Sequence, residues 1–374
     1  MTLRSTLLAA LIALLQPAAA MRAQAGPTSW DRAAVTARIA DLQKISTPEG
    51  IEVLEPVQVG GTTQWISIRG QNRANPVLLM IHGGPAWPMM PTSWAWQKPW
   101  EDFFTVVQWD QRGSGKNAVT ADSATLARTL SVDRMVRDAE EVVEHLRKRL
   151  GKEKVVVLGY SWGTMVGTLL AQKRPDLLYA YVGMGQAVST AAERVIYDRV
   201  LAQARRAGNV EAVRTLETLE PYPGPNPRIE SLLEVRKWAR EYNGGWYGRK
   251  DFDLFYSLPQ WAPEYTAADI AAQFATSGWI GSGLIQDINR IDLGKITDFK
   301  VPVVFLMGRH DLHTPYQPVK AWYDRITAPH KRFMTFERSA HFMMFEEPGR
   351  LLLALVNEVL PLAGGSPPFT QEVP

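Results

Sequence analysis

The stretch Val155–Thr164, with the sequence VVVLGYSWGT, decides the fold of this chain. Its first four residues are aliphatic and three of them are β-branched, which is typical of a strand buried on both faces of a sheet. Ser161 follows, with a glycine two positions away on either side, and residues 162–172 have the pattern of a helix. The stretch therefore predicts a sharp strand-to-helix turn that lifts the Ser161 hydroxyl above the sheet.

The glycines of this turn, Gly159 and Gly163, are expected because a Cβ atom at either position would collide with neighbouring backbone. The backbone N–H of Trp162 is then placed at a helix N-terminus, where positive partial charge stabilises an oxyanion. A pattern with three fixed positions also arises by chance. The strand before it and the helix after it are what make Ser161 a candidate nucleophile.

The composition is that of an ordinary globular protein, with 46% hydrophobic and 21% charged residues among 374. This length suffices for one large core with an inserted subdomain. The chain has no cysteine, which excludes disulfides and thiolate chemistry. Its formal charge of +3 gives no reason to expect nucleic acid or an anionic membrane as a partner.

The first 25 residues have the features of a signal peptide. Arg4 supplies positive charge, Leu7–Leu15 is an unbroken apolar run, and two alanine-rich triplets that follow each fit a cleavage site. The run is too short to span a bilayer as a helix, so no stable membrane span is expected after cleavage. We expect an exported protein, periplasmic or secreted. An uncleaved anchor and initiation at Met21 are the alternatives.

Strand-like and helix-like segments alternate along the chain. The expected strands are residues 51–58, 62–69, 75–82, 103–109, 155–158, 179–184, 301–307 and 331–336. A helix is expected between Ser131, as its N-cap, and Gly151, where it stops. Another is expected near 318–326, and a last one over 348–360. This alternation predicts an α/β fold: a mostly parallel sheet with helices on both faces.

Between residues 185 and 294 the pattern changes to helical stretches interrupted by prolines, with several tryptophans. We interpret this segment as a helical cap inserted between two strands of the sheet. The expected organisation is a signal peptide (1–25), the first part of the core (26–184), the cap (185–294), the second part of the core (295–363) and a flexible tail (364–374).

A serine hydroxyl needs a base to take its proton, and the base needs a third group to orient it. After a turn of this kind, the acid and then the histidine follow the serine in the chain. Of six histidines, only His341 follows a strand near the end of the chain. Asp311 also follows a strand and lies 30 residues earlier, which leaves room for one helix and one strand. We predict Ser161, Asp311 and His341 as catalytic residues. Asp110 precedes the serine and is expected to tie its own loop, 110–115.

The oxyanion needs a second donor besides the Trp162 N–H. The loop His82-Gly83-Gly84-Pro85 follows a strand expected beside that of Ser161, and glycine lets backbone approach a reacting carbonyl closely. We assign this donor to Gly84, with Gly83 as the alternative. His82 is expected to brace the loop by hydrogen bonds.

Taken together, these residues resemble the proline iminopeptidase branch of the α/β-hydrolases. The resemblance rests on five motifs: His82-Gly83-Gly84-Pro85, Asp110-Gln111-Arg112-Gly113-Ser114-Gly115, Gly159-Tyr160-Ser161-Trp162-Gly163, Gly308-Arg309-His310-Asp311 and Ser339-Ala340-His341. It implies an α/β-hydrolase with an inserted helical cap. It also implies a serine hydrolase without cofactor or metal that removes N-terminal residues, often proline, from short peptides.

Two departures from that family bear on the substrate. Ala86 stands where a glycine usually follows the proline of the His-Gly-Gly-Pro motif, and no Trp-Glu pair occurs in the cap to meet a substrate amine. The cap does hold other acidic residues, including Glu220, Glu241, Asp251, Asp253 and Glu264. Each is expected to be a solvated surface carboxylate rather than an amine ligand, and the cap tryptophans are expected in its core.

Three functions follow from these features. The first is an exported aminopeptidase of proline iminopeptidase type, acting on a short peptide or other small molecule. The second keeps the same three catalytic residues but hydrolyses an ester, lactone or small amide in an apolar cap pocket. The third, a binding protein without activity, is disfavoured by the complete set of catalytic residues. Dehalogenase and epoxide hydrolase relatives need an acid in place of Ser161.

Overall fold

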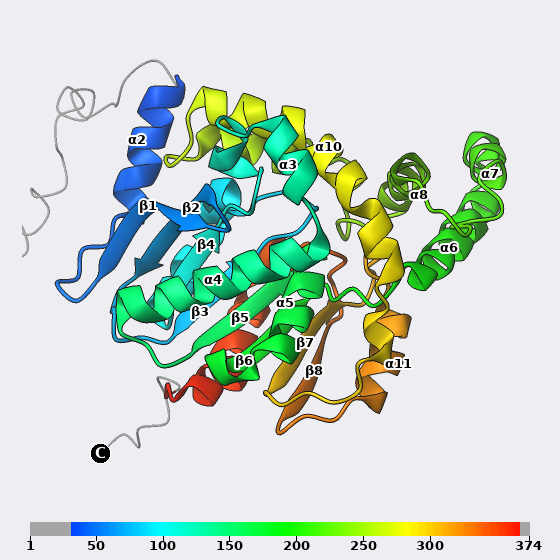
Figure 1. Ribbon diagram of the computed structural model, residues 1–374. Helices are drawn as coiled ribbons and strands as arrows, with labels where there is room; N and C mark the ends of the chain where they lie inside the picture. The colour runs from blue at the N-terminus through cyan, green and yellow to red at the C-terminus, as the bar shows by residue number, and fades with distance from the viewer. Residues whose placement is uncertain (1–30, 367–374) are drawn as a thin grey trace, which may run out of the picture.

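The computed structural model describes residues 31–366 (Figure 1). The predicted signal peptide, and residues 367–374 of the predicted tail, lie outside the described residues. Eight strands form one sheet in the order β1-β2-β4-β3-β5-β6-β7-β8. The strands are β1 (Ile51–Val59), β2 (Thr62–Gly70), β3 (Val77–Ile81), β4 (Thr105–Trp109), β5 (Val155–Tyr160), β6 (Leu178–Met184), β7 (Val303–Gly308) and β8 (Lys331–Phe336).

The sheet is mostly parallel, as the alternation of elements predicts. β1 and β2 form an antiparallel hairpin, and β2 is also antiparallel to β4. All pairs from β4 through β3, β5, β6 and β7 to β8 are parallel. The carboxyl ends of these six strands therefore meet at one edge of the sheet, where loops after them can bring side chains together.

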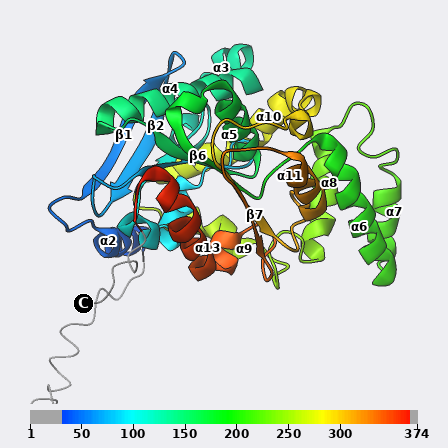
Figure 2. The same ribbon diagram turned by 90° about the horizontal axis from the view of Figure 1, so that it is seen from below.

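Helices cover both faces of the sheet (Figures 1 and 2). The longer helices are α2 (Arg32–Gln43), α4 (Val132–Leu150), α5 (Trp162–Lys173), α6 (Glu193–Arg206), α7 (Val210–Glu217), α8 (Ile229–Glu241), α10 (Ala267–Arg290) and α11 (Tyr316–Arg325). The shorter ones are α3 (Ser123–Thr129), α9 (Asp253–Ser257), α12 (Met343–Glu346) and α13 (Pro348–Ala354). Together α4, α5 and α11 pack on one face and α13 on the other.

Strand β5 shows why both faces must be covered. Val155 and Val157 point into one hydrophobic core, and Val156 and Leu158 into the other. All four side chains are fully buried, because successive residues of a strand alternate between its faces. A continuous aliphatic run is what such a doubly covered strand requires.

Helix α4 begins and ends where the sequence indicates. The Ser131 hydroxyl accepts the backbone N–H of Arg134 at 3.1 Å, and Gly151 has the left-handed φ of 62° that terminates the helix. The last helix is shorter than expected: α13 ends at Ala354, and the chain continues as a π turn and a 3₁₀ turn to Ala363. Pro361, which has no N–H to donate, lies in the 3₁₀ turn that follows the π turn. Helix α2 was not predicted, and none of its residues is buried.

The segment between β6 and β7 is mainly helical and contains α6 to α10. Helices α6, α7 and α8 project from one end of the sheet in Figure 1 and pack around a small core of their own. Helix α10 returns over the loop that follows β4: the Thr276 hydroxyl donates to the Gly113 carbonyl at 3.3 Å. This segment therefore lies over the carboxyl edge of the sheet.

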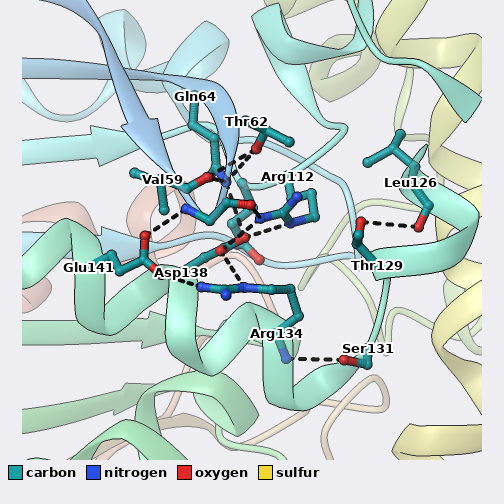
Figure 3. A network of polar contacts seen from close by, with 12 residues as sticks. Val59, Thr62, Gln64, Arg112, Leu126, Thr129, Ser131, Arg134, Asp138 and Glu141 are labelled. Atoms are coloured by element: carbon teal, nitrogen blue, oxygen red, sulfur yellow. Dashed lines mark hydrogen bonds and ion pairs between the residues drawn. The ribbon is translucent and has the colours of Figure 1, made fainter.

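A buried ion-pair network fixes the loop after β4 from the other side (Figure 3). Arg112, which is 1% exposed, pairs with Asp138 of α4 at 2.7 Å and donates to the Gly60 carbonyl in the β1–β2 turn at 2.9 Å. Arg134 also pairs with Asp138, at 2.7 Å. Removing one partner of such a buried pair costs about 3–5 kcal/mol, so this network holds the loop rigidly.

Candidate active site

Ser161 lies at a strained corner between β5 and α5. Its φ of 54° and ψ of −120° are unusual for a residue with a side chain, and its side chain is partly exposed. A Cβ atom on Gly163 would lie 1.9 Å from the Ile81 carbonyl oxygen, and one on Gly159 would lie 2.5 Å from the Gly163 oxygen. Both glycines are therefore required for the reason that the sequence suggests.

The structure brings Ser161, His341 and Asp311 into one chain of hydrogen bonds. The Ser161 Oγ lies 2.9 Å from His341 Nε2, and His341 Nδ1 lies 2.7 Å from Asp311 Oδ2. The geometry assigns the ring proton to Nδ1, which donates to the carboxylate, and leaves Nε2 to accept the serine hydroxyl. Asp311 is fully buried and His341 is 3% exposed.

The Asp311 carboxylate is held by its own loop. Its Oδ1 accepts the backbone N–H groups of His313 and Thr314 at 2.7 and 2.9 Å, and its Oδ2 accepts the Thr314 hydroxyl at 2.8 Å. The His313 ring lies 4.8 Å from that of His341, and burial lowers the pKa of His313 well below its usual value. His313 is therefore neutral and does not repel a protonated His341.

A cap segment that the sequence analysis missed joins the acid and base loops. The carbonyl of Gly244 accepts the N–H of Leu312 at 2.8 Å, and the carbonyl of Gly245 accepts the N–H of His341 at 3.0 Å. A Cβ atom on Gly244 would lie 2.5 Å from the Leu312 side chain. The Gly-Gly pair among the cap aromatics was the available signal for this close approach.

Glu346 reinforces the same junction. Its Oε1 accepts the N–H of Ala340 at 3.0 Å and that of Tyr247 at 2.5 Å. Burial raises the pKa of Glu346 to about 7. The Tyr160 hydroxyl donates to the His341 carbonyl at 3.1 Å, so the base loop is fixed by both cap and core.

The glycine loop after β3 lies against the serine. A Cβ atom on Gly83 would lie 3.0 Å from the Ser161 Cβ. The Gly83 carbonyl accepts the N–H of Trp87 at 3.1 Å, and Gly84 has a φ of 113° that favours glycine. Because the C=O and N–H of one peptide point in opposite directions, the Gly84 N–H is directed away from Trp87. Trp162 is the first residue of α5, where an N–H has no partner within the helix.

His82 braces this loop, as expected. Its Nδ1 lies 2.9 Å from the Gly83 carbonyl and its Nε2 accepts the Gln111 N–H at 3.2 Å. Gln111 also donates from its amide to the His82 carbonyl at 2.9 Å and accepts the Trp162 indole N–H at 3.1 Å. Gln111 thus links both sides of the candidate oxyanion hole, a role that the sequence analysis did not assign.

Asp110 ties the loop 110–115 to the cap rather than acting beside Ser161. Its Oδ2 accepts the Lys116 N–H at 2.8 Å and the Tyr265 hydroxyl at 2.5 Å. Asp110 is fully buried, and burial raises its pKa to about 7. Asp311, and not Asp110, lies within hydrogen-bond distance of the His341 ring.

Comparison with known proteins assigns this architecture to a family. The model of the serine aminopeptidase family S33 matches residues 101–348. The chain belongs to that family. It is a serine hydrolase of the α/β-hydrolase fold, and the resemblance to proline iminopeptidases inferred from the motifs is confirmed.

Individual relatives of this S33 family member support the same assignment. It is 29% identical over 309 residues to a probable aminopeptidase, YbaC, of Bacillus subtilis, covering 81% of this chain and 95% of the relative. It is 25% identical over 264 residues to a proline iminopeptidase of Neisseria meningitidis, covering 66% and 76%. The crystal structure of proline iminopeptidase from Mycobacterium smegmatis matches with a TM-score of 0.59 at 21% identity, covering 83% of this chain and 98% of that one. At that identity it shows the fold alone.

The five acidic cap residues named above differ in their surroundings. Glu220 pairs with Arg194 at 2.9 Å and Glu241 pairs with Lys250 at 2.7 Å, both on the surface. Asp251 and Asp253 are also exposed. Glu264 departs from the expected solvated state: it is half-buried in a surface hollow that Glu52 of β1 and Arg69 of β2 also line, and burial raises its pKa. Its location disfavours a role beside Ser161.

The cap tryptophans divide in the same way. Trp238 and Trp246 are 6% and 5% exposed and lie in hydrophobic cores, as expected, whereas Trp279 is 41% exposed. Within residues 31–366, no cluster of histidine and acidic side chains could hold a metal ion. Over the same residues, no helix has both the length and the apolar character needed to cross a bilayer.

Proposed function

We propose that this family member is an aminopeptidase that releases N-terminal residues from short peptides through an acyl-enzyme on Ser161. The observation that carries the proposal is the hydrogen-bonded chain from Ser161 Oγ through His341 to Asp311, at 2.9 and 2.7 Å. Such a chain makes a weak nucleophile reactive, because the base is already within proton-transfer distance and already oriented.

In the proposed reaction, Ser161 Oγ attacks the carbonyl carbon of the scissile bond while His341 Nε2 takes the hydroxyl proton. Asp311 Oδ2 stabilises the imidazolium through the Nδ1–H bond. The N–H groups of Trp162 and Gly84 stabilise the tetrahedral oxyanion, with Gly83 as the alternative second donor. His341 then gives its proton to the leaving amine. Water, activated in turn by His341, releases the acyl group from Ser161.

A second candidate is hydrolysis of an ester, lactone or small amide by the same three residues. The surroundings of the acidic side chains in the cap favour this second candidate over the aminopeptidase. The two named surface carboxylates that carry ion pairs are already neutralised by Arg194 and Lys250, and Glu264 lies toward β2. An aminopeptidase needs a group that recognises a free amine, and an esterase does not.

One assay separates the two. Prolyl anilide, alanyl anilide and a short acyl ester are offered to the same preparation, with Ser161→Ala as the blank. We expect cleavage of at least one anilide, and acetylation of its free amine should abolish that cleavage. Hydrolysis of the ester alone would replace the aminopeptidase proposal with the second candidate.

We also propose that the protein is exported, because residues 1–25 have the charge and apolar pattern of a signal peptide. Fractionation of cells that express the full chain tests this. We expect a shortened chain outside the cytoplasm, and a full-length chain retained in the cytoplasm would contradict it.

A further inference from the structure

A path of aromatic rings leads from the catalytic base to the glycine loop. Phe342 follows His341 directly, and the two rings lie 5.8 Å apart. Phe342 lies 4.6 Å from Phe255 of α9, which in turn lies 5.9 Å from Trp87. The path therefore begins at one side of Ser161, at His341, and ends at the other side, just beyond Gly84.

Trp87 is fixed close to the serine through its backbone. Its N–H donates to the Gly83 carbonyl at 3.1 Å, and Gly83 packs directly against the Ser161 Cβ. The neighbouring Ala86 carbonyl accepts the Gln273 amide of α10 at 2.5 Å. The Trp87 ring is thus held between the core and the cap before any substrate arrives, which reduces the entropy lost on binding.

The outer end of the path is open to solvent. Trp87 makes edge-on contacts with Tyr256 of α9 at 5.4 Å and with Phe274 of α10 at 5.6 Å. Tyr256 is 38% exposed and Phe274 is 45% exposed, whereas Phe255 and Phe342 are almost completely buried. Three aromatic rings gathered from separate elements around an accessible surface are typical of a binding site for an apolar group.

We propose that Trp87, Tyr256 and Phe274 form an aromatic wall that binds the side chain of the residue whose carbonyl Ser161 attacks. The enzyme then prefers large apolar or aromatic residues at that position over alanine and proline. This inference rests on the proposed function for the position of the carbonyl. A large side chain gains because it covers exposed ring surface that a small or cyclic one leaves in water.

The test compares kcat/KM for phenylalanyl, leucyl, alanyl and prolyl anilides. For the wild type we expect phenylalanyl and leucyl to exceed alanyl and prolyl by about 10- to 200-fold, the range that apolar pocket contacts supply. In Phe274→Ala and Trp87→Ala the ratio of phenylalanyl to alanyl should fall at least tenfold. Trp87→Phe should keep most of it.

Trp279→Ala is the matched control. Trp279 lies on α10 as Phe274 does, is 41% exposed, and takes no part in the ring contacts of the wall. Its substitution should leave the ratio unchanged. A wild type that cleaves the alanyl or prolyl substrate as fast as the phenylalanyl one would overturn the proposal. So would a Phe274→Ala variant that keeps the wild-type ratio.

Failure of the aminopeptidase proposal would look different. An enzyme that cleaves none of the anilides but does cleave esters contradicts that function and leaves the wall testable with acetyl and 3-phenylpropionyl esters of one phenol. Preference for the phenylpropionyl ester that is lost in Phe274→Ala supports the wall. Equal preference in both proteins refutes it.

Discussion

Two groups of serine, histidine and aspartate occur at the carboxyl edge of this sheet. The first group is Ser161, His341 and Asp311, and the second group is Ser114, His82 and Asp110. In both, a histidine follows a parallel strand and its Nε2 lies near a serine Oγ, at 2.9 Å in the first group and 3.1 Å in the second. By residue type and local distance the groups look alike, yet they differ in what the second ring nitrogen of the histidine contacts.

The difference lies on the far side of each ring. In the first group Nδ1 donates to the Asp311 carboxylate, which can stabilise a positive charge on the ring. In the second group Nδ1 faces the Gly83 carbonyl, and Asp110 is turned toward Lys116 and Tyr265. Burial lowers the pKa of His82 to about 4. Only the first group therefore has a carboxylate placed to orient its histidine and to stabilise a proton on it.

Removing the two serine hydroxyls should give the largest contrast. Ser161→Ala should lower kcat on the order of 10⁶-fold, because the nucleophile is lost. Ser114→Ala should leave kcat within tenfold of wild type. The hydroxyl that it removes is fully buried and donates to the Gln111 carbonyl. Initial rates on one anilide or ester measure both. Turnover of the Ser161 variant within tenfold of wild type would remove this serine from the mechanism.

Replacing the two carboxylates by amides should give the next largest contrast. Asp311→Asn should lower kcat about 10⁴-fold, because an amide donating to Nδ1 stabilises the wrong tautomer and cannot balance an imidazolium. Asp110→Asn keeps an oxygen for Lys116 and Tyr265 and should change kcat by less than tenfold. Equal losses in the two variants would mean that the groups do not differ as described.

Substitution of the two histidines should affect the pH profile of kcat/KM differently. His341→Gln removes the base. His82→Gln disturbs only the bracing of the Gly83–Gly84 loop, so we expect about a tenfold loss in kcat, below the 10²–10³-fold that one lost oxyanion donor costs. The pH profile of kcat/KM decides between these roles. It should keep its wild-type shape in His82→Gln, and a displaced acid limb there would contradict a purely bracing role.

The smallest contrast is in the pH dependence of stability. With a pKa raised to about 7, folded Asp110 holds a proton that the unfolded chain releases near pH 4, so it makes unfolding easier as pH rises from about 4 to 7. Neutral His82 has the opposite effect between about pH 4 and 6.5. Asp110→Asn removes only the first slope. As pH rises across that window, the unfolding free energy of Asp110→Asn should increase relative to that of wild type by up to about 1.4 kcal/mol per pH unit.

Urea titrations of both proteins between pH 4 and 8 measure that difference. A difference that stays constant across the window would show that Asp110 is already ionised in the folded state. Glu346, whose pKa is also raised to about 7, adds the same slope to both proteins and cancels in the comparison.

Much of this architecture was predictable because its signals are local. Consecutive aliphatic residues indicate a strand buried on both faces. Gly159 and Gly163 are required because a Cβ atom at either position would clash with neighbouring backbone. The order of serine, acid and histidine separated Asp311 from Asp110 without coordinates. Helix α2 was missed because it buries none of its residues and so carries no apolar stripe to detect.

Contacts between distant segments were not predictable in this way. The backbone of Gly244 and Gly245 joins the acid loop to the base loop across about 70 to 100 residues of sequence. Gln111 spans the candidate oxyanion hole, and Glu264 is half-buried near Arg69 although its sequence context suggested a solvated side chain. Backbone carbonyls are the same for every residue, so their partners leave almost no trace in the sequence.

The amino-acid sequence by itself determined the layered sheet, the serine turn and the residues that stand at the ends of parallel strands, because periodicity and steric exclusion act over a few neighbours. Tertiary structure alone decided that Asp110 is turned toward Lys116 and Tyr265 and that the His82 ring faces the Gly83 carbonyl. It also decided that the rings of Tyr256 and Phe274 lie against that of Trp87. Those outcomes depend on how loops that are distant in the sequence pack against one another, and on the burial that this packing imposes on each charge.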